Sequence, residues 1–257
     1  MTTRELVGFV PFSIMPLSDA IQTVLDEAKR VAEPNQTSGV AMHFCNAYNV
    51  ALARSDPEYR GLINQGDYIF SDGVPITWVG KRVRPDMSHD WERVYGPDVM
   101  QGVFAQSTQQ QPRHYLVGGS PEVLKALERS LAQRYPEAHV VGAESPPFRP
   151  ATADELRERD SRIADSGATI VWIGLGTPRH DYEAARLARH LPVVAIGVGA
   201  AFDFLSGTKP QAPLWMQKSG TEWLFRLVSE PRRLTKRYVW GNSVFILEAA
   251  RTLRSKH

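Results

Sequence analysis

The chain has 257 residues, of which 42% are hydrophobic and 23% charged, a composition typical of a globular protein with a sizeable core. Its one cysteine, Cys45, excludes an internal disulfide framework and a cysteine-rich zinc site, and suits a reducing compartment. No stretch approaches the roughly 18 to 20 apolar residues of a membrane span, and the first residues lack the pattern of a signal peptide.

Short apolar runs alternate with helical patterns along the chain. Strands are predicted over residues 39–44, 67–71, 113–119, 138–143, 168–174 and 193–199. Helices are predicted over residues 18–33, 120–135, 151–167 and 177–190. Several runs are apolar on both faces, as buried strands of α/β sheets are. Together with Ser120 as an N-cap before Pro121, this alternation predicts an α/β fold, a Rossmann-like layered sheet with helices on both faces.

A proline-rich segment around Lys209 to Pro213 is the predicted boundary between a catalytic body, residues 1–207, and a helical appendage, residues 208–257. From Lys209 onward there are ten Lys or Arg and three Glu, a net charge of +7, so the remainder carries −5 of the total of +2. Aromatic residues are interleaved with this basic charge, which is typical of a helix at an anionic membrane or of a phosphate-binding element. A solvated charged face is the alternative.

Glycines follow four of the predicted strands, at Gly73, Gly118-Gly119, Gly174–Gly176 and Gly197–Gly199. Ligands of such sheets bind at the carboxyl ends of the strands, where glycine turns and helix N-termini face phosphates. Each turn alone is usually structural, but four of them predict a nucleotide or diphosphate crevice. The complete G-x-G-x-x-G fingerprint is missing, which disfavours a dinucleotide.

The motifs of zincins, serine hydrolases and P-loop enzymes are absent from the sequence. No D-x-D motif occurs, which weakens a metal-clamped nucleotide-sugar site. The charge of a leaving diphosphate would then be met by helix termini and arginines, which the basic appendage offers.

Two carboxylates stand out. Asp72 ends an apolar strand between Ser71 and Gly73, so it is a candidate general base or, equally, the cap of a helix beginning near Val74. Asp203 lies between two phenylalanines and is a candidate ligand of a base or ribose, or a turn cap. A histidine placed like His180, in the first turn of a helix, is usually just exposed.

Taken together, the segments FCNAYNVALAR, SDGVPITW, YLVGGSPEV, RYPEAHVVG, WIGLGTPRHDY, IGVGAAFDFLSGTKPQAPLW and GTEWLFRLVSEPRRLTKRY resemble the WecG/TagA/CpsF family of bacterial glycosyltransferases. The resemblance runs from about residue 39 almost to the C-terminus. It implies an inverting, metal-independent transfer of a hexose-type sugar from a UDP-sugar to a polyprenyl-linked acceptor, without a further cofactor, in cell-surface polysaccharide synthesis. It also implies a cytoplasmic protein, peripheral on the inner face of the plasma membrane, and hints at self-association.

The resemblance assigns roles to single residues. Asp72 matches the family's proposed base, and Arg226, Arg233 and Arg237 match arginines thought to reach the diphosphate and the membrane. The expected substrate-binding residues are Asn46, Gly73, Gly118, Gly119, Gly176, Thr177, His180, Gly199, Phe202 and Asp203.

Three positions depart from the family's pattern. Phe44 replaces a threonine, His180-Asp181 replaces Gln-Glu, and Gln211 replaces an arginine. These changes indicate a different sugar or acceptor.

The same residues leave other functions open. A non-catalytic nucleotide-sugar binder or scaffold is the main alternative, because Phe44 and His180-Asp181 alter expected positions. A dinucleotide-dependent oxidoreductase would need the missing fingerprint. Nucleic acid is not expected as a partner, because the basic charge lies among apolar helical residues.

Overall fold

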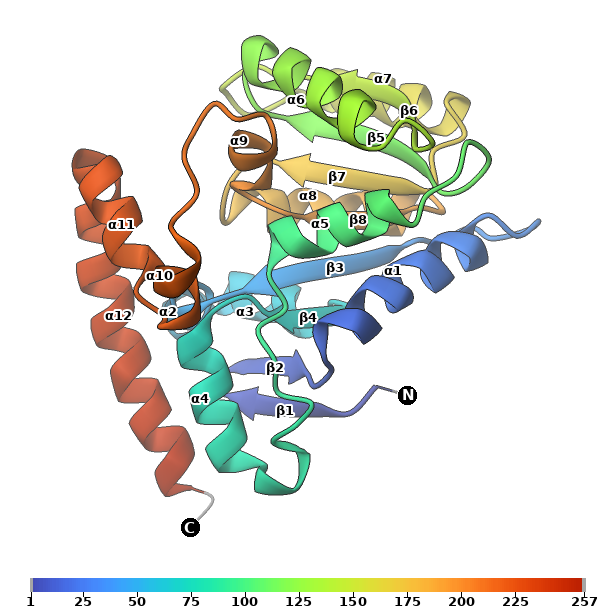
Figure 1. Ribbon diagram of the computed structural model, residues 1–257. Helices are drawn as coiled ribbons and strands as arrows, with labels where there is room; N and C mark the ends of the chain where they lie inside the picture. The colour runs from blue at the N-terminus through green and yellow to red at the C-terminus, as the bar shows by residue number, and fades with distance from the viewer. Residues whose placement is uncertain (1, 256–257) are drawn as a thin grey trace. The chain divides into compact units, whose positions relative to one another are not determined.

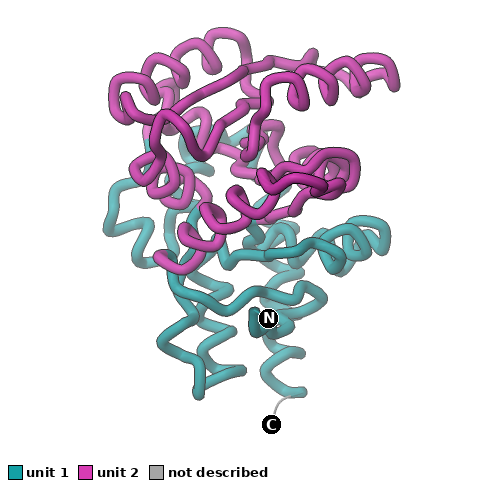
Figure 2. The backbone as a smooth tube through the Cα atoms, turned by 90° about the vertical axis from the view of Figure 1, so that its right-hand side faces the viewer, with its two compact units in different colours: residues 1–17, 44–95, 211–257 teal, residues 18–43, 96–210 magenta. Residues whose placement is uncertain are grey.

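The computed structural model describes residues 2–255, except the side chain of Arg233 (Figure 1). Two compact units are distinguished, coloured separately in Figure 2. Unit 1 comprises residues 1–17, 44–95 and 211–257, and unit 2 comprises residues 18–43 and 96–210. Residues 211–257, the larger part of the expected appendage, therefore cluster with two earlier stretches of the chain. The expected boundary at residue 207 stays a prediction.

The main sheet has six strands in the order β4-β3-β8-β7-β5-β6. Their bounds are β3 Val40–Cys45, β4 Tyr68–Ser71, β5 Arg113–Gly118, β6 His139–Glu144, β7 Ile170–Gly174 and β8 Val194–Gly197. Within unit 2, β3, β8, β7, β5 and β6 pair in parallel, with Val194 of β8 opposite both Val40 and Ile170. All six strands were predicted from their apolar runs, to within two residues at each end.

The helices of unit 2 are α1 (Leu17–Val31), α5 (Gly96–Ala105), α6 (Pro121–Arg134), α7 (Ala153–Asp165), α8 (Arg179–His190) and α9 (Ala201–Leu205). One face of the strands packs on α7 and α8 through residues such as Val171, Ile163 and Leu187. On the other face, Phe104 of α5 stacks on His114 of β5. Figure 1 shows α5 in front of these strands and α8 behind them. The expected Rossmann-like layering is confirmed.

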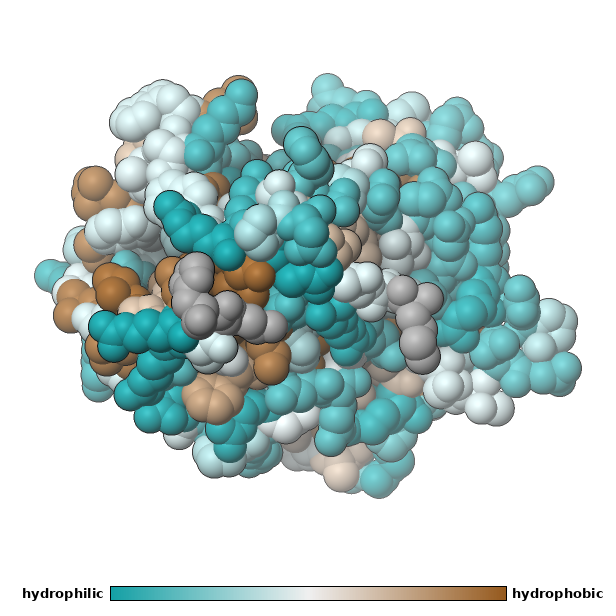
Figure 3. Space-filling model, turned by 90° about the horizontal axis from the view of Figure 1, so that it is seen from below, coloured by the Kyte–Doolittle hydropathy of each residue, from teal (hydrophilic) through white to brown (hydrophobic). Residues whose placement is uncertain are grey.

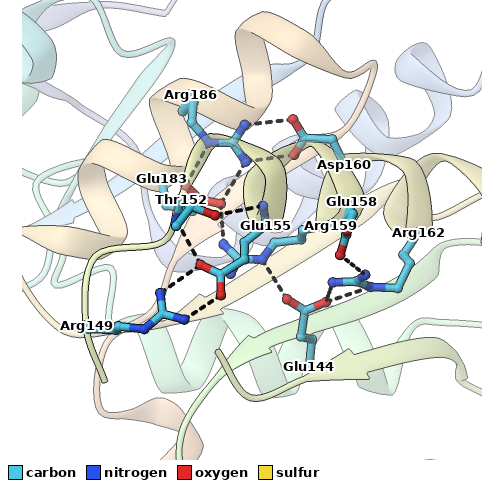
Figure 4. A network of polar contacts seen from close by, with 10 residues as sticks. All are labelled: Glu144, Arg149, Thr152, Glu155, Glu158, Arg159, Asp160, Arg162, Glu183 and Arg186. Carbon is cyan, nitrogen blue, oxygen red and sulfur yellow. Dashed lines mark hydrogen bonds and ion pairs between the residues drawn. The ribbon is translucent and has the colours of Figure 1, made fainter. Parts of the chain in front are cut away.

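Ion pairs attach α7 to its neighbours in unit 2 (Figure 4). The buried guanidinium of Arg159 donates to Glu144 of β6 at 2.7 Å and to Glu183 of α8 at 3.0 Å. Arg186 makes a two-pronged contact with Asp160, each bond 2.7 Å long. Because paired and hydrogen-bonded charges offset their loss of hydration, this cluster holds α7 against β6 and the middle of α8.

Unit 1 begins with an antiparallel hairpin, β1 (Arg4–Val7) and β2 (Val10–Ser13). Its remaining helices are α2 (Ala47–Ser55), α3 (Pro57–Asn64), α4 (Val74–Val83), the short 3-10 helix η1 (Pro85–Met87), α10 (Leu214–Lys218), α11 (Glu222–Ser229) and α12 (Pro231–Arg254). The expected helical character of the C-terminal region is confirmed. Helices α12 and α2 approach closely at Gly241, where a Cβ atom would lie 3.1 Å from the ring of Tyr48.

Candidate active site

A pocket in unit 1 gathers several of the residues singled out in the sequence. Its lining includes Asn46, Asp72 and Gly73 together with Arg226 and Arg237. These residues come from the start of α2, the turn after β4, α11 and α12. The pocket therefore combines a carboxylate with the guanidinium groups of the C-terminal helices. The side chain of Arg233, the third expected arginine, lies outside the described part of the structure.

The N-terminus of α2 determines how Asn46 is oriented. Its side-chain oxygen accepts from the backbone N–H of Tyr48 at 3.0 Å, while Asn49 accepts from the backbone N–H of Asn46, which completes a capping box. The amide oxygen is thus used by the cap, and the amide nitrogen is left to donate. It points at Asp72, with 3.5 Å between Nδ2 and the carboxylate oxygen.

The alternative role of Asp72, as the cap of α4, is not observed. The N-cap of that helix is Gly73, and no side chain makes the cap hydrogen bond. Asp72 instead follows β4, with its backbone N–H donated to the carbonyl of Cys45 at 2.9 Å. Its half-buried carboxylate lines the pocket.

Two pocket residues that the sequence did not indicate, Arg93 and Tyr95, lie beside Asp72. Arg93 donates to the Asp72 carbonyl at 3.2 Å and pairs with Glu222 of α11. Its guanidinium lies over the Tyr95 ring, 3.8 Å from the ring centre. Burial and the Glu222 carboxylate raise the pKa of Tyr95, so its hydroxyl stays neutral and donates to Glu222 at 2.9 Å. The only available signal was their i, i+2 spacing, which places side chains on one side of an extended segment.

The two arginines of the pocket are held differently. Arg237 lies over the ring of Tyr48 at 4.1 Å, a cation–π contact. Burial opposes the charge of Arg226, but Tyr238, Glu222, Tyr95 and Asp72 outweigh it and raise its pKa. Arg226 is therefore charged at every working pH.

Phe44, at the position where the resemblance implies a threonine, points into the core. It is buried and packs on Phe70 of β4, with 5.2 Å between ring centres. Phe44 therefore contributes apolar packing between β3 and β4.

The expected glycine turns of unit 2 lie at the ends of β5, β7 and β8. Gly118, Gly119, Gly176 and Gly199 all have positive φ angles, which glycine adopts without strain. A Cβ atom on Gly118 would lie 2.6 Å from the backbone of Gly174, so these two turns are in direct contact.

Phe202 and Asp203 of α9 differ in what they contact. Phe202 is almost fully buried, and a Cβ atom on Gly174 would lie 2.6 Å from its ring, so it supports the turns as packing. Asp203 pairs with Lys209 at 3.0 Å. Its role as a nucleotide ligand stays a prediction.

Unlike most histidines in the first turn of a helix, His180 is not exposed to solvent. It is almost fully buried at the start of α8, and its Nε2 lies 3.3 Å from the hydroxyl of Thr177. The neighbouring Asp181 is fully buried, with His43 of β3 at 3.1 Å and His180 at 3.4 Å. Burial alone would raise the pKa of Asp181, but the two imidazoles outweigh it and lower that pKa, so the carboxyl is ionised.

Exposed apolar side chains gather on the C-terminal helices of unit 1. Leu214 and Trp215 of α10 are 71% and 67% exposed, and exposed lysines and arginines such as Lys218 and Lys236 lie among such residues. Seen from below, brown hydrophobic side chains alternate with teal hydrophilic ones at the left of Figure 3. Among the described residues, no helix combines the length and apolar character that a membrane crossing requires.

None of the described His, Cys, Asp and Glu side chains form a group of three or more that could hold a metal ion.

The structure contains a parallel sheet with glycine turns at its strand ends, and a pocket that pairs a carboxylate with arginines. Together with the comparison with known families, these features define an enzyme of the glycosyltransferase class. The model of the glycosyl transferase WecG/TagA/CpsF family matches residues 7–257, nearly the whole chain. The protein belongs to this family, which fits a role in cell-surface polysaccharide synthesis.

Proposed function

We propose that this protein transfers a hexose-type sugar from a UDP-sugar to a polyprenyl-linked acceptor, with inversion at the anomeric carbon and Asp72 as general base. The observation that carries the proposal is the unit 1 pocket, where Asp72 and the guanidinium groups of Arg93, Arg226 and Arg237 share one lining. Membership of a glycosyltransferase family supports the reaction class.

In the proposed reaction, the Asp72 carboxylate accepts the proton of the acceptor hydroxyl as that oxygen bonds to the anomeric carbon. The bond between this carbon and the UDP oxygen breaks, and UDP leaves with the electron pair. The amide of Asn46 donates toward Asp72, and Arg93 holds its backbone carbonyl, so the carboxylate is oriented in advance. A positioned base of this kind contributes typically about 10²- to 10⁴-fold in rate.

The departing diphosphate needs positive charge. Arg226 and Arg237 line the same pocket as Asp72, and the raised pKa of Arg226 keeps it charged. Guanidinium groups can bind phosphate oxygens through two parallel hydrogen bonds. We propose that these arginines stabilise UDP as it leaves, so that transfer proceeds without an added metal ion.

We propose that the glycine turns of unit 2 bind the nucleotide part of the donor. Gly118, Gly119, Gly176 and Gly199 have the positive φ angles that let backbone N–H groups face a ligand closely. The N-termini of α6 and α8 follow two of these turns, and helix N-termini favour anions.

The acceptor is expected at a membrane surface. The exposed apolar residues of α10 to α12, mixed with basic ones, suit the interface of an anionic bilayer, where apolar burial and charge attraction add. We propose peripheral attachment to the inner face of the plasma membrane through these helices.

The decisive experiment compares Asp72→Asn with Asp26→Asn, a matched change at an exposed position of α1. Transfer from a panel of UDP-hexoses to a polyprenyl diphosphate-linked sugar is measured with EDTA and with magnesium, and UDP binding is measured separately. We expect Asp72→Asn to lose at least about 100-fold in turnover while UDP binding persists. Native-level turnover by this variant would contradict the role of Asp72 as general base. UDP binding without transfer by the native chain would favour a non-catalytic binder.

A further inference from the structure

Three side chains of unit 2 form a buried ionisable cluster that the proposed reaction does not use. Asp181 of α8 is fully buried and lies between His43 of β3 and His180 of α8. With both imidazoles neutral, the three side chains together carry one negative charge. With one imidazole protonated, they carry none. These two states of the cluster therefore differ by one proton and by one unit of charge.

The positions of the protons follow from the hydrogen bonds. Because the Asp181 carboxylate only accepts, His43 must donate to it through Nδ1, and the same carboxylate, 3.4 Å away, favours a proton on Nε2 of His180, which also lies 3.3 Å from the Thr177 hydroxyl. This leaves Nε2 of His43 and Nδ1 of His180, and both are buried without a hydrogen-bond partner in the described part of the chain. Buried polar atoms are rarely left unpaired, because such an atom has lost its hydrogen bonds to water without replacing them. An unpaired nitrogen in a candidate binding region therefore points to a missing ligand.

The ring of His180 lies directly beneath the turn that follows β8. A Cβ atom on Gly197 would lie 3.1 Å from its Cγ, and one on Gly199 would lie 3.3 Å from Cε1 and 3.6 Å from Nδ1. Only glycines leave the ring this close to the turn. The unpaired Nδ1 thus lies at the glycine turn, at the N-terminus of a helix 12 residues long.

We propose that binding of the nucleotide donor makes this cluster take up one proton, and that His180 then presents a charged Nδ1–H to an anionic oxygen of that donor. The inference rests on the proposed function, since it takes the unit 2 turns as the donor site. It adds a positioning role for Asp181 and His43, and makes donor affinity dependent on pH.

The charges around His180 favour this behaviour. Asp181 faces it from its own helix and stabilises an imidazolium, and His43 reaches it only through that carboxylate. Thr177 contributes a neutral hydroxyl. Of the other charged groups on adjoining segments, Asp203 is paired with Lys209, and Arg179 lies over the ring of Phe148. An incoming diphosphate or sugar carboxylate adds negative charge, which raises the proton affinity of a nearby imidazole.

The resemblance implies a glutamine at position 180, and glutamine cannot bind a proton. The coupling between proton uptake and donor binding therefore depends on the histidine of this chain. An imidazole that is neutral in the free chain and protonated in the complex takes up one proton on binding. Linkage fixes the direction of the pH dependence. Because binding takes up a proton, the affinity for the donor increases as the pH falls and decreases as the pH rises.

The test is isothermal titration calorimetry of the full chain at pH 7.5, in buffers of different ionisation enthalpy, with UDP-glucose and with UDP-glucuronate. Neither ligand titrates near this pH. We expect uptake approaching one proton in the native chain, and affinity about tenfold higher at pH 6.5 than at pH 8.5. His180→Gln should bind with no uptake and no such pH dependence, and Asp181→Asn should also lose the uptake.

His139→Gln, at an exposed histidine of β6, is the matched control and should keep the uptake. Uptake with both ligands would assign the anionic oxygen to the diphosphate, and uptake with UDP-glucuronate alone would assign it to the sugar carboxylate. Binding without uptake, or equal uptake by His180→Gln, would overturn this inference and leave the proposed function intact. No binding of UDP or either sugar nucleotide would overturn both.

Discussion

Arg93 and Glu222 form an ion pair in the lining of the Asp72 pocket, although 129 residues separate them in the chain. The same guanidinium donates to the carbonyl of Asp72 and lies over Tyr95, whose hydroxyl donates to Glu222. One arginine therefore links helix α11 to the turn that carries the proposed base. The C-terminal helices contribute to the shape of the pocket as well as to its charge.

Arg93→Lys should disturb the pocket without removing its charge. Lysine keeps one positive charge, but its compact ammonium lacks the planar array of donors with which Arg93 reaches both the Asp72 carbonyl and Glu222 while lying flat on Tyr95. We expect turnover to fall about tenfold or more, with little change in the midpoint of thermal unfolding. Arg82→Lys, on the exposed side of α4, is the matched control and should keep native turnover. Equal activity of the two variants would show that the Arg93 link does not orient Asp72.

Arg226→Gln and Arg237→Gln test the handling of the leaving group. Each change removes a charged donor from the pocket, and the loss of one preorganised donor costs typically about 10²- to 10³-fold in rate. We expect kcat to fall more than donor binding, because the charge on UDP develops as the bond breaks. The assay uses a short-chain acceptor in detergent, so that membrane attachment does not enter.

The control for this pair is Arg232→Gln, at an exposed position of α12. Its kcat in detergent should match that of the native chain. If all three variants lose activity equally, the effect belongs to the overall charge of the appendage, and the assigned roles are wrong.

His114 makes the stability of unit 2 sensitive to acid. The indole N–H of Trp172 donates to its Nδ1 at 3.0 Å, so the proton must be on Nε2, which donates to Ser107 at 2.9 Å. Burial, together with the charge of His139, lowers the pKa of His114 to about 3. In the unfolded chain the imidazole of His114 binds a proton near pH 6.5, whereas in the folded chain it stays neutral down to about pH 3. The free energy of unfolding therefore decreases as the pH falls below about 6.5.

The expected slope from this residue is about 1.4 kcal/mol per pH unit between roughly pH 6.5 and pH 3. Urea unfolding of the native chain and of His114→Gln at pH 7.5, 6.0 and 5.0 measures it. We expect the variant to be less stable than the native chain at pH 7.5. Its free energy of unfolding should, however, decrease less steeply as the pH is lowered. Parallel curves for the two proteins would contradict the assignment.

The sequence was most informative where local pattern decides the structure. The six strands follow from apolar runs, and the turns at Gly118 and Gly199 follow from residues that tolerate positive φ. Asp72 was singled out from its neighbours in sequence, and Asn46 from the resemblance of its segment to the family. The hairpin of β1 and β2 was missed because two four-residue strands are too short to show a period.

The contacts that complete each site were not predictable, because they join distant parts of the chain. Nothing near Arg93 indicates that it pairs with Glu222, and nothing near His43 indicates that it meets Asp181. The burial of His180 also depends on the glycine turn after β8, which the first turn of α8 does not reveal. Such pairings are set by tertiary packing, and local spacing carries no record of them.

Membrane attachment through α10 is tested by Leu214→Ser combined with Trp215→Ser. Both side chains are largely exposed, and burying a large apolar side chain is worth about 1.5–3 kcal/mol. We expect the double variant to bind anionic liposomes at least about tenfold more weakly in a sedimentation assay, with its unfolding midpoint unchanged. Phe148→Ser is the matched control, because Phe148 is 92% exposed but belongs to unit 2. Raising the salt concentration should weaken binding of the native chain as well, since surface charges are screened within about 8 to 10 Å at physiological ionic strength. Native-level liposome binding by the double variant would exclude α10 as the anchor, and equal loss by Phe148→Ser would show that any exposed aromatic residue has the same effect.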